Sequence, residues 1–222
     1  MAKMKKADSE VREAVQIELG WDTRVEDAAI GVEIEQGVVT LNGTVGSWAA
    51  RLAAHEAAHR VAGVLNVANH LDVKLTSGTS RTDAEISQAV RNALDWDVFV
   101  PKTRIRSSVA DGQVTLEGEV DHLSQREDAE KAVRNIWGVR RVLDKIQVKP
   151  APAAPHEVQK SIEAALERRA AREARRINLD VHEGKVILSG VVHSWAERQS
   201  VVGAARGTPG VRSVDDRLHI EL

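Results

Sequence analysis

The sequence contains no cysteine, which excludes disulfide bonds, thiol catalysis and cysteine-ligated zinc. It also has no apolar run near the length of about 18 residues that a membrane-spanning helix needs. The segment Met1–Glu10 contains lysines with no hydrophobic stretch after them, which is not the pattern of a secretory signal. From these absences we expect a cytoplasmic protein without a transmembrane segment.

A basic excess is missing as well. The 222 residues carry a formal net charge of −2, whereas nucleic-acid-binding domains usually have a clear surplus of lysine and arginine. We therefore expect no nucleic-acid partner, and any attraction to an anionic surface must come from a local patch.

The feature that dominates the sequence is an internal repeat. The pattern Gly-x-Val-x-Leu-x-Gly occurs at Gly37–Gly43, Gly112–Gly118 and Gly184–Gly190, and a Gly-Val pair follows 20 residues after each second glycine. Three matches in one order and with one spacing indicate tandem copies of a single unit. We define module 1 as residues 7–76, module 2 as residues 80–149 and module 3 as residues 155–222.

Hydrophobic periodicity predicts the same elements in every module. In module 1, apolar residues from Val11 to Leu19 recur at helical spacing, and Ile30, Val32 and Ile34 alternate with other residues as in a strand with one buried face. A second alternating segment, a second helical pattern and a final apolar segment complete the unit. The sequence thus predicts an α+β fold of three α-β-β-α-β modules, each a three-stranded sheet with two helices packed on one face.

Local signals define the connections. The pairs Gln36-Gly37, Asp111-Gly112 and Glu183-Gly184 predict tight hairpin turns with positive φ. Gly43 and its counterparts lie inside a strand, which predicts a bulge or a close backbone approach. Ser47 and Ser194 are predicted N-caps of the second helices. The late glycine of each module is interpreted as a helix C-cap.

The Gly-x-Val-x-Leu-x-Gly core, the valine two residues after it and the late Gly-Val pair resemble the BON domain of bacterial osmotic-shock and nodulation proteins. Since all three modules carry these residues, the resemblance extends over nearly the whole chain. It implies a non-enzymatic protein without cofactors or catalytic residues. It also implies attachment to phospholipid or other envelope components under osmotic stress.

One segment matches a metal-site motif. His55-Glu56-Ala57-Ala58-His59 fits H-E-x-x-H, which places two zinc ligands on one helical face. The aligned positions in the other modules hold Glu130 and Arg134, or Val202 and Arg206, so the module does not depend on the motif. We interpret the two histidines as part of an exposed helix face and predict no metal. The pair Asp215-Asp216 has no partner acid, base or metal ligand in the sequence pattern and is interpreted as a solubilising pair at a strand edge.

Candidate contact residues come from tryptophans and arginines. Trp48 and Trp195 share a position at the start of the second helix, and Trp21 and Trp96 share one after the first helix, where the third copy has Arg168. Such recurring tryptophans are either staples onto the core or, if the rings point outward, anchors at a membrane interface. The densest basic cluster is interpreted either as a solvated helix end or as a phosphate-headgroup site, and it consists of Arg168, Arg169, Arg172, Arg175 and Arg176.

Three hypotheses follow. The first is a stress-related protein that docks reversibly on anionic phospholipid or a membrane-associated partner, gaining avidity from three modules and using the arginine cluster with Trp48 and Trp195. The second is a protein-interaction or holdase-like protein that binds other polypeptides through sheet edges or apolar surface. The third is a zinc hydrolase built on His55 and His59. The oligomeric state remains open.

Overall fold

The computed structural model describes residues 8–25, 29–75, 81–169 and 177–221. Each module folds in the predicted order of helix, strand, strand, helix, strand, which confirms the α+β class. Module 1 consists of α1 (Asp8–Trp21), β1 (Ile30–Glu35), β2 (Val38–Val45), α2 (Trp48–Arg60) and β3 (Asn66–Val73). Module 2 consists of α3 (Asp83–Trp96), β4 (Ile105–Ala110), β5 (Gln113–Val120), α4 (Leu123–Arg134) and β6 (Arg141–Val148). Module 3 consists of α5 (Pro155–Arg169), β7 (Ile177–His182), β8 (Lys185–Val192), α6 (Trp195–Arg206) and β9 (Ser213–Ile220).

The second strand of each module occupies the middle of its sheet. β1 runs antiparallel to β2 and β3 runs parallel to β2, and the same pairing recurs in the sheets β4-β5-β6 and β7-β8-β9. Parallel neighbours cannot be joined by a tight turn, so the chain crosses over the sheet between them. The second helix of each module makes this crossover.

The three hairpin turns have the predicted backbone conformation. Both residues of Gln36-Gly37, Asp111-Gly112 and Glu183-Gly184 have positive φ, between 48° and 79°. Positive φ at both positions matches the twist of the flanking strands, which is why these turns favour glycine.

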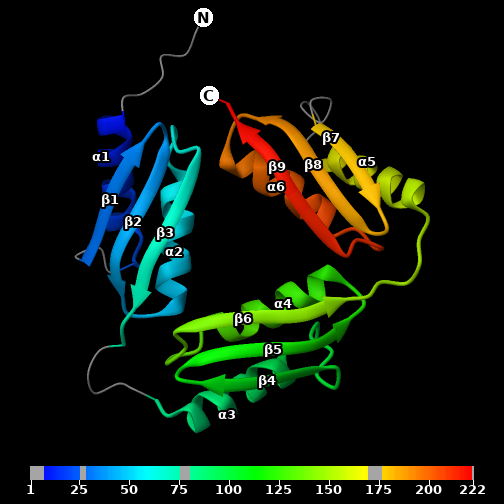
Figure 1. Ribbon diagram of the computed structural model, residues 1–222, viewed down its shortest axis with the longest axis horizontal. Coiled ribbons are helices and arrows are strands. Elements are labelled where there is room, and N and C mark those ends of the chain that lie inside the picture. Colours follow the sequence, from blue (N-terminus) through cyan, green and yellow to red (C-terminus); the bar gives the residue numbers. More distant parts are fainter. Residues whose placement is uncertain (1–7, 26–28, 76–80, 170–176, 222) are drawn as a thin grey trace, which may run out of the picture.

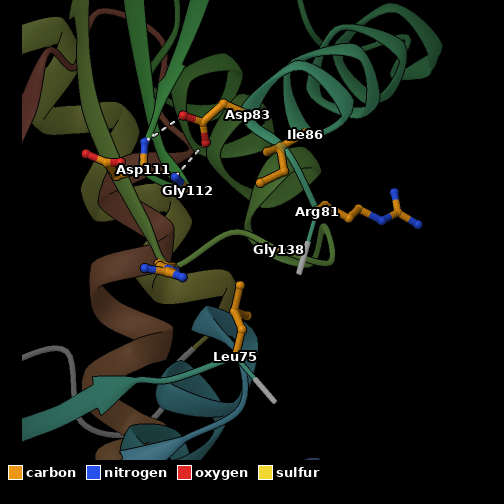
Figure 2. A pocket seen from close by; sticks show the side chains of 8 residues that line it. Leu75, Arg81, Asp83, Ile86, Asp111, Gly112 and Gly138 are labelled. Atoms are coloured by element: carbon orange, nitrogen blue, oxygen red, sulfur yellow. Dashed lines mark hydrogen bonds between the residues drawn. The ribbon is translucent and has the colours of Figure 1, made fainter. Parts of the chain in front are cut away.

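The first helix secures the turn in two of the modules. The Asp83 carboxylate accepts hydrogen bonds from the amides of Asp111 (2.8 Å) and Gly112 (2.9 Å), as Figure 2 shows. Asp8 does the same for the turn of module 1. Module 3 has Pro155 at this position and lacks the carboxylate.

The glycines inside the middle strands mark a close backbone approach. A Cβ atom on Gly43 would overlap the carbonyl oxygen of Ala29, and one on Gly118 would overlap that of Arg104. Their φ angles of 124° and 144° also lie outside the range that side chains favour. The parallel register of β2 with β3, and of β5 with β6, continues through both glycines without an extra residue, and of the two predicted alternatives the close approach is the one observed.

Each module has its own core between the sheet and its two helices. The residues of module 1 that are at most 1% exposed come from α1, β2 and α2, and they are Val11, Val15, Val39, Leu41, Ala54, Ala57 and Ala58. The corresponding positions of modules 2 and 3 form two further clusters. The prediction of two helices on one face of each sheet is therefore confirmed.

The helix N-caps follow the prediction, but the late glycines do not. Ser47 and Ser194 accept hydrogen bonds from first-turn amides at 3.0 and 3.1 Å. The C-cap interpretation is wrong, because α2 already ends at Arg60. Gly63, with φ 105°, instead lies in a following turn, which the amide of Val64 closes by donating to a carbonyl oxygen three residues earlier (3.2 Å).

The three modules surround a common centre (Figure 1). α2, α4 and α6 lie on the inward side, while α1, α3 and α5 lie toward the outside. In this view all three sheets lie in front of their helices, so their uncovered faces point to the same side of the molecule.

Candidate functional site

The first residue of each second helix lies at the contact with the next module. Trp48 packs against the core of module 2, and its amide donates to the carbonyl oxygen of Val139 (3.4 Å). Leu123 of module 2 is buried in the core cluster of module 3. Trp195 of module 3 stacks on His59 of module 1, with ring centroids 3.6 Å apart and an interplanar angle of 6°. Equivalent positions thus join the modules cyclically into a closed ring.

The interpretation of His55 and His59 as an exposed pair is wrong for His59. Its side chain is 3% exposed, and its Nδ1 atom is buried without a hydrogen-bond partner. Burial, together with the neighbouring His55 and Arg198, lowers the pKa of His59 to about 3. The imidazole is therefore neutral and serves as a flat packing surface for Trp195.

This burial also bears on the metal motif. One of its two histidines lies under an indole ring of another module. Across the described residues, no group of three histidine, aspartate or glutamate side chains is placed to hold a metal ion. In the closed ring the H-E-x-x-H segment therefore packs modules together.

A recurring arginine that the sequence analysis missed supports these contacts. It lies three residues after the first residue of each second helix. Arg126 donates through Nε to Asp144 (2.7 Å) and Arg198 to Asp216 (2.8 Å), each linking the helix to the third strand. Arg51 makes the same link through backbone carbonyl oxygens of β3. The signal was visible in the sequence as an arginine at one position of all three modules.

The arginine also holds the tryptophan. The guanidinium groups of Arg51 and Arg198 lie over the indoles of Trp48 and Trp195, 5.0 and 5.4 Å from the ring centroids. Such cation–π contacts stabilise the orientation of the ring. Each indole is thus held by an arginine of its own module as well as by the neighbouring module.

The interpretation of Asp215 and Asp216 as one solubilising pair is wrong. Asp216 binds Arg198 on the helix-covered face of the sheet, and Asp215 binds Arg217 (2.9 Å) on the other face. Because neighbouring residues of a strand point to opposite faces, the two carboxylates do not form a pair.

The contact between modules 2 and 3 includes an ion pair in addition to the buried Leu123. Arg206 forms an ion pair with Glu127 (3.1 Å) across this contact. The half-buried Glu130 lies close by, and burial and the Asp144 carboxylate raise the pKa of its side chain. Arg206 of module 3 occupies the position that His59 has in module 1. This position therefore forms an ion pair with Glu127 at one interface and stacks on the indole of Trp195 at another.

The predicted lipid-contact residues fall into two groups. Arg168 and Arg169 are the last two residues of α5, whereas Arg172, Arg175 and Arg176 lie outside the described residues. Trp48 and Trp195 are half-buried between modules. Lipid contact through these residues stays a prediction.

The most exposed large apolar side chains lie elsewhere. Across the described residues these are Val98 (88%), Trp96 (86%), Trp21 (79%) and Phe99 (69%). Trp96 ends α3 and Trp21 ends α1, so the condition that these two rings point outward is met. Val98 and Phe99 follow Trp96 directly, and we name Trp96, Val98 and Phe99 the apolar turn.

Backbone hydrogen bonds fix the apolar turn. Asp97 accepts from the amide of Phe99 through its side chain (2.9 Å) and from the amide of Val100 through its carbonyl (3.3 Å). Val100 is buried in the core and anchors the turn, while Val98 and Phe99 project into solvent. The turn therefore displays apolar side chains on a defined backbone.

Module 1 builds the same turn with polar residues. Asp22 accepts from the amides of Arg24 (3.2 Å) and Val25 (2.8 Å) as Asp97 does, and Val25 is buried like Val100. Thr23 and Arg24 occupy the positions of Val98 and Phe99. The backbone of this turn therefore does not require apolar side chains. The difference between the two copies was the feature of the sequence that could have identified the apolar turn.

No helix within the described part of the chain is long and apolar enough to cross a membrane.

Comparison with known proteins agrees with the repeat. The BON domain family model matches residues 7–74, 82–150 and 156–221. Osmotically-inducible protein Y of Escherichia coli (strain K12) is 30% identical over 146 residues, which cover 64% of this chain and 73% of that protein.

Similar solved structures include CdsD, a structural protein of the type III secretion system of Chlamydia trachomatis. It has 12% identity and a TM-score of 0.26, covering 94% of this chain and 91% of that one. The C-terminal domain of CdsD has 11% identity and a TM-score of 0.27, with both chains fully covered. TM-scores this low carry no argument about arrangement or function. With the family model matched in each module, this chain belongs to the BON domain family and contains three BON domains in tandem.

Proposed function

We propose that this protein is a non-enzymatic binding protein of the osmotic-stress response that docks on the surface of anionic phospholipid membranes. One observation carries the proposal. Three of the four most exposed large apolar side chains of the described residues lie within four consecutive positions, on the apolar turn of module 2. Exposed apolar groups gathered in this way mark an interaction surface.

The composition of the turn suits a bilayer interface. Tryptophan favours the boundary between headgroups and acyl chains, and valine and phenylalanine gain from removal from water. The exposed Lys102 follows in the same loop, where its ammonium group can reach lipid phosphates. A short apolar insertion next to a cation is what a peripheral membrane contact needs.

Other parts of the chain can add to this contact. Trp21 presents a second exposed indole at the position in module 1 that Trp96 has in module 2. Module 3 has Arg168 there, at the beginning of the arginine cluster. Simultaneous weak contacts on one chain multiply through their high effective concentration. We therefore assign the strongest apolar contribution to module 2 and an electrostatic contribution to module 3.

The link to osmotic stress rests on similarity to the osmotically inducible relative and on the family. A protein-binding or holdase role is the competing function, since exposed apolar side chains can also bind polypeptides. Co-sedimentation with anionic and neutral vesicles at low and high salt separates the two. Membrane docking predicts binding to anionic vesicles that salt weakens. Failure to bind vesicles, with salt-tolerant suppression of client aggregation, would support the competing function.

A further inference from the structure

The three interfaces of the ring differ in how the chain holds them. Modules 1 and 2 are consecutive, as are modules 2 and 3, so the chain tethers both pairs directly. Modules 3 and 1 come from opposite ends of the sequence. Their contact therefore depends directly on non-covalent packing around Trp195, His55 and His59.

The interfaces are also where buried polar atoms lack partners. Within the described part of the chain, the buried side-chain nitrogens without a hydrogen bond are Nε1 of Trp48 and Nδ1 of His59. Each belongs to a residue that packs against a neighbouring module. An unsatisfied buried polar group opposes burial, so it favours separation of the two surfaces. Among the described residues, the buried side-chain polar atoms that lack hydrogen-bond partners thus lie where modules meet and not inside the modules.

The surroundings of His59 make the contact between modules 3 and 1 sensitive to protonation. The indole of Trp195 covers its ring, and the charged or titratable groups that act on it are His55 of α2 and Arg198 of α6. A second positive charge near Arg198 is unfavourable, and a buried imidazolium would lose its hydration. His55 is also held toward its neutral form by burial, although the adjacent Glu56 opposes this.

We propose that the contact between Trp195 and His59 is a latch that acid releases, so that protonation of His59 opens the ring between modules 3 and 1. In the open chain the face of Trp195 and the His55–His59 face of α2 meet solvent. A surface that is half-buried at neutral pH thereby becomes accessible. The proposal concerns the state of the ring and does not depend on membrane docking.

The direction of the pH effect follows from linkage. The pKa of His59 is held at about 3 in the closed ring and rises toward its ordinary value of 6.5 when the ring opens. The open state therefore binds more protons at intermediate pH, and closure is strongest above pH 6.5 and weakens as the pH falls. The ratio of open to closed molecules should change little above pH 6.5 and approach a tenfold rise per pH unit well below it, which gives about thirtyfold between pH 7.5 and pH 5.

The absence of cysteine makes a direct test possible. Cysteines introduced at the exposed Glu13 of α1 and Lys160 of α5 carry two spin labels, and pulsed electron resonance measures the distance between modules 1 and 3 in the full chain. We expect one narrow distance at pH 7.5 and a growing broad component at pH 5. Trp195→Ala should be broad at both values. His59→Phe, which retains a ring for stacking and cannot be protonated, should be narrow at both.

Two controls make the result decisive. Trp21→Ala removes an exposed indole outside the interfaces and should behave like the wild type. Circular dichroism at pH 5 verifies that the modules remain folded. A wild-type distance that stays narrow at pH 5 would overturn the proposal. So would a His59→Phe variant that broadens as much as the wild type.

Discussion

The indole of Trp195 lies flat on the imidazole of His59, although 135 residues of chain separate them. Equivalent residues make the other two contacts, Trp48 against module 2 and Leu123 against module 3. Three BON domains that could fold as separate units thus form one cyclic body. Small domains of this size are only marginally stable alone, so these contacts should contribute to the stability of each.

Removal of the indole should weaken this body measurably. Trp195→Ala should reduce the free energy of unfolding by about 1–3 kcal/mol, because it uncovers apolar surface on both modules. Urea denaturation followed by circular dichroism measures the change. Trp21→Ala, at a site that is 79% exposed, should change stability by less than about 0.5 kcal/mol. Equal effects of the two substitutions would contradict a stabilising interface at Trp195.

A second prediction concerns the repeat pattern itself. Gly43→Ala should destabilise module 1 by more than about 2 kcal/mol, because its Cβ would overlap the carbonyl oxygen of Ala29 at a positive φ. Gly46→Ala is the matched control, since nothing lies within 4 Å of the added Cβ. If both variants unfold at the same urea concentration, the close approach does not explain this glycine.

Asp22 provides a prediction about pH. Its carboxylate, 7% exposed, accepts hydrogen bonds from Arg24 (2.7 Å) and Arg60 (2.9 Å), and these hold its pKa below the ordinary value of 3.8. A lowered pKa stabilises the fold above pH 3.8, and this contribution is lost as the pH falls below that value. Asp22→Asn should therefore cost about 1–3 kcal/mol at pH 7, because it removes the charge from two hydrogen bonds. The difference from the wild type should shrink in unfolding experiments near pH 3, and a difference independent of pH would count against this role.

The fold of each module follows from local signals in the sequence. The alternation in β1, the Asp111-Gly112 turn and the Ser47 cap depend on neighbours along the chain, and period and composition reveal such features. Gly63 shows the limit of this approach, because a glycine after a helix suits a C-cap and a following turn equally well. Only the position at which α2 ends distinguishes them.

The closed ring of three modules could not be predicted from local signals in the sequence. His59 flanks the apolar stripe of α2, which in a single module would place it toward water. In the whole chain the indole of Trp195 from another module covers it, and a contact between the two ends of the chain leaves no periodic trace. Arg126 and Asp144 were predictable in principle, since their positions recur as Arg198 and Asp216. Comparison of the polar positions of the copies would have revealed them.

The apolar turn was only partly predictable from the sequence. Trp21 and Trp96 share a position, and outward-pointing rings were one of two alternatives for that position. Exposure of Val98 and Phe99 depends on how Asp97 and the buried Val100 orient the turn. The assignment of lipid contact to the arginine cluster, and a cytoplasmic location, stay predictions.

The apolar turn can be replaced without disturbing its backbone. The double substitution Val98→Thr with Phe99→Arg introduces the residues that module 1 already carries in the same turn. We expect unchanged folding because Asp97 and Val100 remain, and the exchange also adds one positive charge. Apolar insertion predicts that vesicle binding falls about tenfold or more, whereas purely electrostatic binding predicts that it rises.

The most direct measurement is therefore co-sedimentation of the wild type and this double variant with anionic vesicles at low and high salt. The wild type should bind, more weakly at high salt, and the variant should bind less than the wild type at both salt concentrations. Equal or stronger binding by the variant, or no vesicle binding by the wild type, would contradict membrane docking through the apolar turn.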